Sequence, residues 1–275
     1  MTEYDADAFD AYEAAGWAGK EAASYDALAG RVTSRLADPL LDAAGATAGS
    51  RVLDVATGPG YVAERAAERG ASPVGLDFSP SMVEFARSRL PGIEVVEGDA
   101  TALPFEDASF DAVVAAFVLL HLGRPELAAR EAVRVVRSAG CVACTVWDVP
   151  ARGRWLGVLL DAVAAAGAAP PEELPAGPPI FRFADERELS GLLADAGLVD
   201  VDVETLEFTL DLESADELWH GLLDGTVRVG PLVNAQSPEV QGAIRAQFDE
   251  LLEPYRAARG FEVPVAVKLA SGRKP

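Results

Sequence analysis

The residues best suited to bind a ligand lie in the segment VLDVATGPGY at residues 52–61, where an apolar run ends in an acid and two glycines. Gly58 and Gly60 let the backbone come within contact distance of a ligand, because no Cβ stands in the way. The residues after them favour a helix, whose first N–H groups can bind a carboxylate or a phosphate. In open α/β sheets ligands bind at such carboxyl ends of strands, so the segment predicts a ligand-binding loop.

The loop alone leaves two kinds of cofactor open. Residues 58–63, GPGYVA, fit the dinucleotide fingerprint, and Asp77 could hold ribose hydroxyls in either an NAD-type or another adenosine cofactor. Asp54 favours the second kind, because its carboxylate repels a pyrophosphate and tolerates a cationic sulfonium or ammonium group. Asp99, in the segment Gly98–Ala100, can accept a hydrogen bond from an adenine amino group.

Alternating strands and helices are expected to position this loop. The strands are expected at residues 51–55, 73–77, 93–96, 110–116 and 141–147, and the helices at 61–69, 80–90 and 125–137. Residues 110–116 are almost continuously apolar, as in a strand covered on both faces. The repetition predicts a parallel sheet with right-handed crossovers, in the α/β class.

The C-terminal part follows another pattern. Helices are expected at 185–196, 214–223 and 238–255, and strands at 199–212 and 261–269. The apolar phase of residues 199–212 slips, which predicts a bulge near Thr205. Pro264 indicates that the last strand is weak or lies near an edge at that point. The chain thus ends in alternating helices and strands that do not form a second nucleotide-binding half.

Two stretches flank the alternating core. Residues 1–45 hold several aromatic residues ahead of a helix near 33–44, and residues 150–183 are rich in Pro, Gly and Ala. The second stretch is expected to be a loop or lid without compact structure. We expect one domain, with an N-terminal helical lid (1–45), a cofactor-binding core (46–150), and a substrate lid with the C-terminal strands (151–275).

Composition limits the partners. The 275 residues carry a formal net charge of -21, which repels phosphate backbones, so no nucleic-acid partner is expected. The acidic N-terminus does not resemble a signal peptide, and no apolar stretch reaches membrane-spanning length, so neither export nor a membrane is expected. Cys141 and Cys144 are expected to be ordinary thiols in a reducing cytoplasm, with no metal site. We expect the protein to be a monomer or a homodimer.

Residues 52–87 and 97–122 together resemble the class I S-adenosylmethionine-dependent methyltransferases. The two segments read VLDVATGPGYVAERAAERGASPVGLDFSPSMVEFAR and EGDATALPFEDASFDAVVAAFVLLHL, and they are most similar to the quinone-biosynthesis-type and related small-molecule enzymes. The resemblance implies a Rossmann-like, seven-stranded, mostly parallel sheet with helices on both faces. Its last strand would be antiparallel and inserted between the fifth and sixth.

The resemblance also implies a cofactor-binding set: Tyr25, Arg31, Asp54, Ala56, Thr57, Gly58, Gly60, Asp77, Phe78, Met82, Asp99, Ala100, Ala116 and Phe117. Tyr25 and Arg31 would meet the cofactor carboxylate, Asp77 would bind both ribose hydroxyls, and Asp99 would hold the adenine. The sequence departs from the family at Ala56, where the loop's first glycine is expected, and the added methyl narrows the cleft.

The implied activity is methyl transfer from S-adenosylmethionine to a small-molecule acceptor, with S-adenosylhomocysteine as product. The apolar lid segments favour a hydrophobic acceptor. If the acceptor is a hydroxyl, a base helps, and His121 is the candidate. Three alternatives stay open: a cyclase or isomerase that keeps the cofactor without methylating, an NAD-dependent oxidoreductase, and a binding or regulatory module.

Overall fold

A seven-stranded sheet forms the centre of the computed structural model, which describes residues 4–18, 22–171 and 174–275. Its strands are β1 (Arg51–Val55), β2 (Ser72–Asp77), β3 (Glu94–Glu97), β4 (Phe110–Ala116), β5 (Val136–Trp147), β6 (Val199–Leu212) and β7 (Phe261–Arg273). The order across the sheet is β3-β2-β1-β4-β5-β7-β6. β1 to β5 are parallel, and β7 runs antiparallel to both β5 and β6. The expected sheet, with its last strand inserted, is confirmed.

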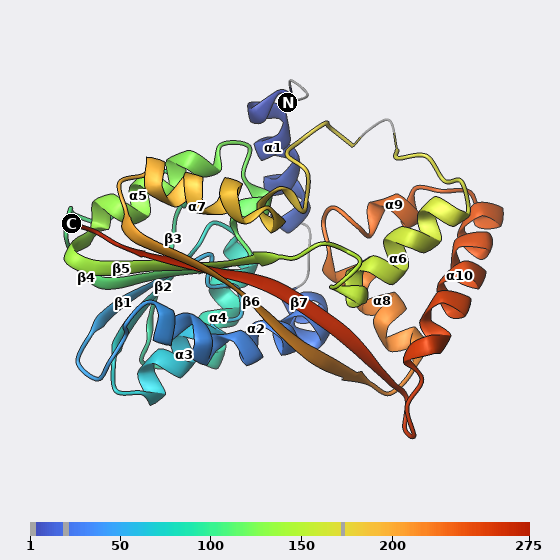
Figure 1. The fold of residues 1–275 in the computed structure, drawn as a ribbon, viewed down its shortest axis with the longest axis horizontal. Coiled ribbons are helices and arrows are strands. Elements are labelled where there is room, and N and C mark those ends of the chain that lie inside the picture. The colour runs from blue at the N-terminus through green and yellow to red at the C-terminus, as the bar shows by residue number, and fades with distance from the viewer. Residues whose placement is uncertain (1–3, 19–21, 172–173) are drawn as a thin grey trace.

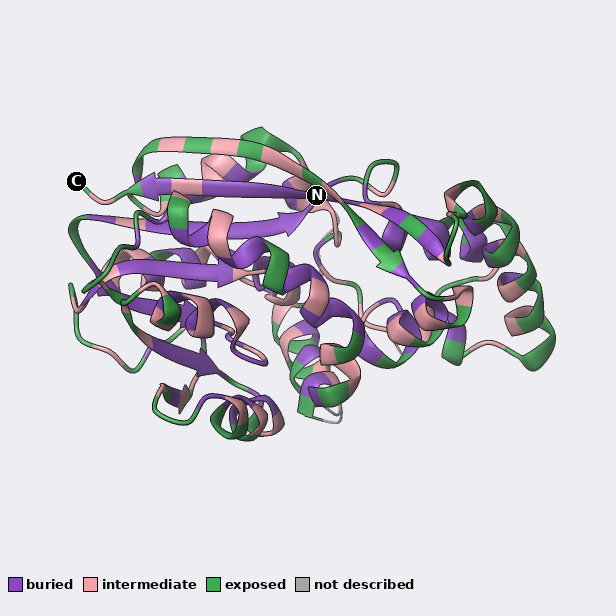
Figure 2. Cartoon of the chain, turned by 90° about the horizontal axis from the view of Figure 1, so that it is seen from below, coloured by how far each residue is buried: buried purple, intermediate pink, exposed green. Residues whose placement is uncertain are grey.

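Helices cover both faces of the sheet (Figure 1). The helices are α1 (Ala6–Ala18), α2 (Ala22–Ala43), α3 (Tyr61–Glu68), α4 (Pro80–Arg89), α5 (Pro125–Val135), α6 (Arg154–Ala165), α7 (Glu186–Asp195), α8 (Ala215–Gly225), α9 (Pro231–Asn234) and α10 (Pro238–Leu252). Single 3₁₀ turns add η1 (Leu119–His121), η2 (Arg182–Ala184) and η3 (Glu253–Tyr255). One apolar cluster joins the sheet to α5 and α7, and another joins it to α2 and α3. The central strands are therefore almost wholly buried (Figure 2).

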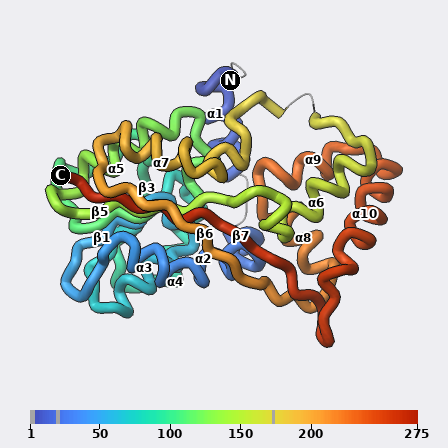
Figure 3. Tube along the Cα trace, in the orientation of Figure 1, coloured from blue at the N-terminus to red at the C-terminus, as the bar shows by residue number. Residues whose placement is uncertain are grey.

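A second group of helices stands beside the sheet. β6 and β7 run on past the other strands, and α6, α8 and α10 pack around their far ends (Figure 3). Trp155, Leu159, Trp219 and Phe248 lie in this cluster and are buried. The cluster continues into Phe117 and Trp147 at the ends of β4 and β5, so it reaches the edge where ligands bind.

The expectation that residues 150–183 lack compact structure is wrong for α6. Its apolar residues recur at helical spacing, and Trp155, Val158, Leu159 and Ala162 are all buried. The prolines that indicated a loop begin only at Pro170, after the helix has ended. The second α-helix likewise begins at Ala22, well before residue 33.

The bulge expected near Thr205 is also wrong. β6 pairs with β7 without interruption from Asp202 to Leu212, and the irregularity lies between Val199 and Asp202, where Asp200 has a φ of 53°. Val201 packs on the α5 and α7 cluster, whereas Leu210 packs on the cluster of α6, α8 and α10. The apolar side of the strand changes because its two halves are covered on opposite faces.

Pro264 lies in the part of β7 that extends past β5. It is paired with Thr209 of β6, while the pairing of β5 with β7 begins only at Val267. The strand is central in the sheet order but is locally an edge at Pro264, which explains how the missing N–H is tolerated.

The two cysteines form no disulfide. Cys144 is buried in β5, and burial raises the pKa of its thiol to about 12. None of the described helices has the length and hydropathy that a membrane span needs.

Candidate functional site

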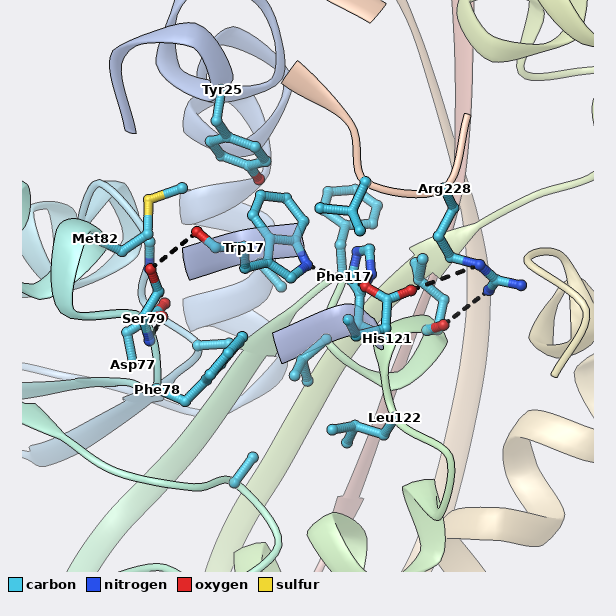
Figure 4. A pocket seen from close by; sticks show the side chains of 18 of the residues that line it. Trp17, Tyr25, Asp77, Phe78, Ser79, Met82, Phe117, His121, Leu122 and Arg228 are labelled. Carbon is cyan, nitrogen blue, oxygen red and sulfur yellow. Dashed lines mark hydrogen bonds and ion pairs between the residues drawn. The ribbon is translucent and has the colours of Figure 1, made fainter. Parts of the chain in front are cut away.

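A pocket lies at the carboxyl edge of the sheet, where five strands contribute residues to it. Ala56 and Gly58 follow β1, Asp77 ends β2, Asp99 follows β3, Ala116 ends β4 and Trp147 ends β5. Helix α1, the start of α2, the turn η1, helix α6 and residues 225–229 form the rest of the wall. Figure 4 shows Asp77, Phe78 and Met82 on one side and His121 and Arg228 on the other, with Trp17 between them.

The glycine loop is held in left-handed backbone conformations. Ala56, Gly58 and Gly60 have φ values of 55°, 52° and 88°. Gly58 lines the pocket, and a Cβ there would approach Tyr25 at 4.0 Å. Gly60 does not line it, and a Cβ there would lie 2.3 Å from Cδ1 of Leu90, so this glycine lets the loop pack against the end of α4.

Asp54 stands behind the loop and does not line the pocket. Its side chain is buried, and one carboxylate oxygen accepts hydrogen bonds from Thr57 Oγ1 at 2.6 Å and from the Ala63 N–H at 3.1 Å. Burial raises the pKa of this carboxyl to about 7. Asp54 and Thr57 therefore tie the loop to the first turn of α3.

Asp77 is placed differently, because it is buried and also lines the pocket. Its two oxygens accept from the Gly58 N–H at 2.9 Å and from the Ser79 N–H at 3.0 Å. Burial raises the pKa of its carboxyl. Phe78 beside it is 39% exposed, an open aromatic face that suits a planar ligand group.

Five more of the residues expected to bind the cofactor line the pocket: Met82, Asp99, Ala100, Ala116 and Phe117. Asp99 Oδ1 accepts from the N–H of Thr101 at 2.7 Å and from its hydroxyl at 2.8 Å, which closes a turn.

Tyr25 and Arg31, expected to act together, are separated by the structure. Tyr25 lines the pocket, with its ring edge-on to Trp17 at 5.6 Å. Arg31 is not brought to the pocket: its guanidinium binds the Glu217 carboxylate and the backbone carbonyl of Asp211. Glu217, in the first turn of α8, is the acid that draws it there.

His121 lies at the pocket in η1, and its Nδ1 is 2.9 Å from Oε2 of Glu13. His220 is exposed on α8. Asp148 follows β5 but does not line the pocket, and it pairs with Arg152 at 3.2 Å.

Several residues that line the pocket were not predicted from the sequence: Glu13, Trp17, Trp155, Leu156, Ile180 and Arg228. A signal existed for the first two: Phe9, Glu13 and Trp17 recur every four residues, and all three are buried on α1. An acid in the middle of a buried helical stripe indicates a carboxylate with a specific partner.

The charges of the pocket decide which cofactor fits. Among the described lining residues, four are acids, Asp10, Glu13, Asp77 and Asp99, and the one guanidinium is that of Arg228. Both Nη atoms of Arg228 already donate to backbone carbonyls, those of Leu120 and Pro178. These acids would repel the negative charges of a pyrophosphate. An adenosyl sulfonium, which is a cation, fits the acids, the glycine loop and the open ring of Phe78.

Comparisons with known proteins agree with this chemistry. Residues 53–144 match the family model described as a methyltransferase domain. The demethylmenaquinone methyltransferase of Renibacterium salmoninarum is 34% identical over 66% of this chain and 80% of its own length. That of Paenarthrobacter aurescens is 30% identical over 66% and 75%.

Solved structures share the fold. A protein named as a methyltransferase from an antibiotic biosynthesis pathway of Anabaena variabilis has a TM-score of 0.60 at 20% identity, over 86% of this chain and 96% of that one. The [4+2]-cyclase SpnF has a TM-score of 0.51 at 23% identity, over 88% and 81%. At these identities the likeness concerns the fold alone.

The chain belongs to the class I S-adenosylmethionine-dependent methyltransferases of the quinone-biosynthesis type. It is an enzyme that transfers a methyl group from S-adenosylmethionine to a small molecule and leaves S-adenosylhomocysteine. This result sets aside the dinucleotide alternative that the glycine loop left open.

Proposed function

We propose that the acceptor is a reduced quinone, a planar aromatic ring with hydroxyl groups and an apolar tail. The observation that carries this proposal is the stack of Phe117 on Trp147 in the pocket wall, with ring centroids 3.6 Å apart and planes 15° apart. Trp155 and Leu156 extend this apolar wall. Such a surface favours a flat hydrophobic ring, and the names of the two relatives supply the chemical class.

The same proposal assigns the cofactor contacts. Asp77 binds the ribose hydroxyls, Phe78 and Met82 pack on the adenosine, and Asp99 with Ala100 holds the adenine. Ala56, Gly58, Ala116, Phe117 and Tyr25 surround the methionine part, and their position in the pocket wall supports this. Asp54, Thr57 and Gly60 act from behind, by holding the loop. Arg31 is left out of the set, since Glu217 binds it.

Methyl transfer needs little from the protein beyond alignment. The cofactor supplies an electrophilic methyl group, and the chain's own residues bind, orient and exclude water. Alignment of this kind can contribute roughly 7–11 kcal/mol to lowering the barrier. We propose that residues 1–45 act as a helical lid over the core at 46–150, and that residues 151–275 supply a substrate lid together with the C-terminal strands.

The proposal extends to the setting of the enzyme. We propose a cytoplasmic monomer or homodimer without a nucleic-acid partner, and the net charge of -21 supports the last point.

Calorimetry tests the cofactor assignment. We expect S-adenosylhomocysteine to bind and NADH not to bind. Asp77→Ala should weaken S-adenosylhomocysteine about 10- to 100-fold, the scale of lost charge-assisted hydrogen bonds. Asp195→Ala, an exposed acid on α7, is the matched control and should bind normally. Unchanged affinity in Asp77→Ala would contradict the ribose assignment.

Mass spectrometry tests the acceptor. With short-chain demethylmenaquinone kept reduced, the product should gain the mass of a methyl group in place of a hydrogen. A product of unchanged mass would support the cyclase or isomerase alternative instead.

A further inference from the structure

Glu13 is a buried carboxylate in the pocket wall that the cofactor contacts do not use. It lies in the middle of α1 and is only 2% exposed. Its Oε2 accepts from Trp17 Nε1 at 3.2 Å and lies 2.9 Å from His121 Nδ1. Its Oε1 has no hydrogen-bond partner in the structure. A carboxylate is costly to bury, so its position calls for a reason beyond packing.

Arg228 places a fixed positive charge beside this carboxylate. Its Nε lies 3.6 Å from Oε1 of Glu13, and its side chain is 14% exposed. The guanidinium cannot swing away, because Nη1 donates to the Leu120 carbonyl at 3.0 Å and Nη2 to the Pro178 carbonyl at 2.7 Å. A fixed positive charge beside Glu13 favours its acceptor-only form.

An ionised Glu13 fixes the tautomer of His121. Because the carboxylate can only accept, Nδ1 carries the hydrogen of the neutral ring, and Nε2 keeps its lone pair. No hydrogen bond joins Nε2 to any residue within the described ranges, and the His121 side chain is 23% exposed in the pocket wall. Trp17 fixes the ring plane from the side, edge-on at 5.2 Å.

We propose that Glu13 orients His121 as the base that removes a proton from the acceptor's hydroxyl, so that the enzyme selects acceptors with an acidic, ring-conjugated hydroxyl. Glu13 is a positioning residue, and His121 is the catalytic one. The inference rests on the proposed function and specifies its acceptor as a phenol-type ring of the hydroquinone class.

When the accepting atom is a ring carbon, the step is a proton transfer followed by methylation. The acceptor's O–H bond breaks, its proton moves to Nε2 of His121, and the oxygen's electron pair is delivered through the ring to form the new carbon–carbon bond. The carbon–sulfur bond to the methyl group breaks, and its electron pair stays on sulfur. The ring C–H proton then leaves to water, which restores the aromatic ring, and His121 returns its proton to the oxygen.

Helix α1 must be docked for this pair to exist. Glu13 comes from α1, outside the sheet, whereas His121 belongs to the core segment after β4. The helix is held by Tyr4, whose hydroxyl donates to the Gly123 carbonyl at 2.8 Å, and by Tyr12, whose hydroxyl donates to the Val227 carbonyl at 3.1 Å. The Glu13–His121 pair therefore exists only while α1 is docked on the core.

Charged groups from several elements surround His121. From α1 the groups are Glu13, Asp10 and Tyr12, from the segment after α8 it is Arg228, and Asp77 and Asp99 belong to the same pocket. The turn η1 and residue 178 present backbone carbonyls to Arg228. Among these groups Glu13 is the acid that contacts the imidazole ring. Its removal should therefore change the hydrogen bonding of His121 more than removal of any other acid.

Kinetics with reduced short-chain demethylmenaquinone test the pair in the full chain. His121→Asn should lower kcat about 100-fold or more, the scale of general-base catalysis, and should abolish the acid limb of the kcat profile. Glu13→Gln should lower kcat about tenfold, with S-adenosylhomocysteine affinity within twofold of wild type. Glu239→Gln, an exposed glutamate on α10, is the matched control. A wild-type kcat in Glu13→Gln or in His121→Asn overturns the proposal.

Nitrogen NMR tests the pair without any acceptor. The chain has two histidines, so His220→Asn leaves His121 as the one observed ring. With S-adenosylhomocysteine bound, we expect a protonated Nδ1 and an unprotonated Nε2 at pH 8, lost in Glu13→Ala. A protonated Nε2 overturns the proposal. The expected tautomer without methylation of the quinol supports the pair and refutes the proposed acceptor.

Discussion

Ala56 occupies a backbone conformation that glycine adopts at less cost. Its φ of 55° falls in the left-handed region, which costs an L-residue roughly 1–2 kcal/mol. Phe117, at the end of β4, has a φ of 57°, so two pocket residues at neighbouring strand ends carry this cost. Strain of this kind persists only where the surrounding structure enforces it, and it gathers at ligand sites.

Ala56→Gly is expected to stabilise the enzyme by about 1 kcal/mol, after allowance for the greater chain entropy of glycine in the unfolded state. The thermal midpoint without cofactor should rise by roughly 2–4 °C, measured by calorimetric scanning. Ala66→Gly in α3 is the matched control, because the same change in a helix destabilises. A lower midpoint for Ala56→Gly would show that the methyl group contributes packing that exceeds the strain.

Asp54 makes stability depend on pH. Its carboxyl has a pKa of about 7 in the folded state against 3.8 ordinarily, because it is buried. Between these values the folded state holds a proton that the unfolded state has released, so the free energy of unfolding falls as pH rises from 4 to 7. The loss amounts to roughly 4 kcal/mol, at about 1.4 kcal/mol per unit.

Asp54→Asn should remove most of this fall, since the amide cannot ionise. Urea denaturation should find the variant more stable than wild type at pH 8, with the difference shrinking towards pH 5. A shallower slope should remain, because burial raises the pKa of Asp77 in the same direction. Parallel stability curves for the two proteins would argue that Asp54 stays ionised in the fold.

At the level of single residues, the sequence predicted positions near the loop better than positions far from it. Asp77 and Phe78 follow a recognisable strand end, and strand ends meet at one edge of a parallel sheet. Arg31 and Glu13 lie on helices outside the sheet, and their partners, Glu217 and His121, are 186 and 108 residues away. Local patterns carry no information on which of many acids and bases will meet at such separations.

At the level of elements, two buried aromatic side chains, Phe9 and Trp17, anchor helix α1. Phe9 is 2% exposed, and a Cβ added to Gly177 would lie 2.2 Å from its ring. The Arg228 guanidinium lies 5.0 Å from the ring centroid. Gly177 therefore allows the backbone at this position to pack directly on the Phe9 ring of α1.

Phe9→Ala is expected to loosen α1 locally. Hydrogen exchange of Ala6–Ala18 should become faster, because one of the two aromatic anchors of the helix is lost. Global stability should change little, whereas the matched variant Phe248→Ala, on the buried face of α10, should lose about 3–5 kcal/mol. Equal losses from both variants would mean that α1 unfolds only together with the sheet.

The elements that sequence patterns misplaced share one cause. α6 is apolar on nearly all sides because it is buried, so composition hid its helical spacing among alanines and glycines. The phase change in β6 arose from two covering layers, which a one-dimensional pattern cannot separate from a bulge. By contrast, each of β1 to β4 packs in a single environment along its length. The ranges predicted for these strands from the sequence are therefore close to those in the structure.

At the level of the whole molecule, charge is the dominant feature. The chain has 44 acidic and 23 basic residues, which leaves a net charge of -21. Folding brings these acids closer together, so mutual repulsion opposes the compact state. The acidic pocket edge shares in this repulsion and attracts a cationic cofactor.

Added salt should therefore stabilise this protein. Between 20 and 300 mM NaCl the Debye length shrinks from about 20 Å to below 10 Å, which screens repulsion between surface acids more than the short contacts of the ion pairs. The thermal midpoint should rise by several degrees, measured by calorimetric scanning at pH 8. Sucrose of equal osmolality is the control, since it leaves the charges unscreened. A midpoint that falls with salt would mean that pairs such as Arg69 with Asp42 contribute more than the net repulsion costs.

The same salt titration should weaken S-adenosylmethionine binding more than S-adenosylhomocysteine binding, because the two ligands differ by the positive charge on sulfur.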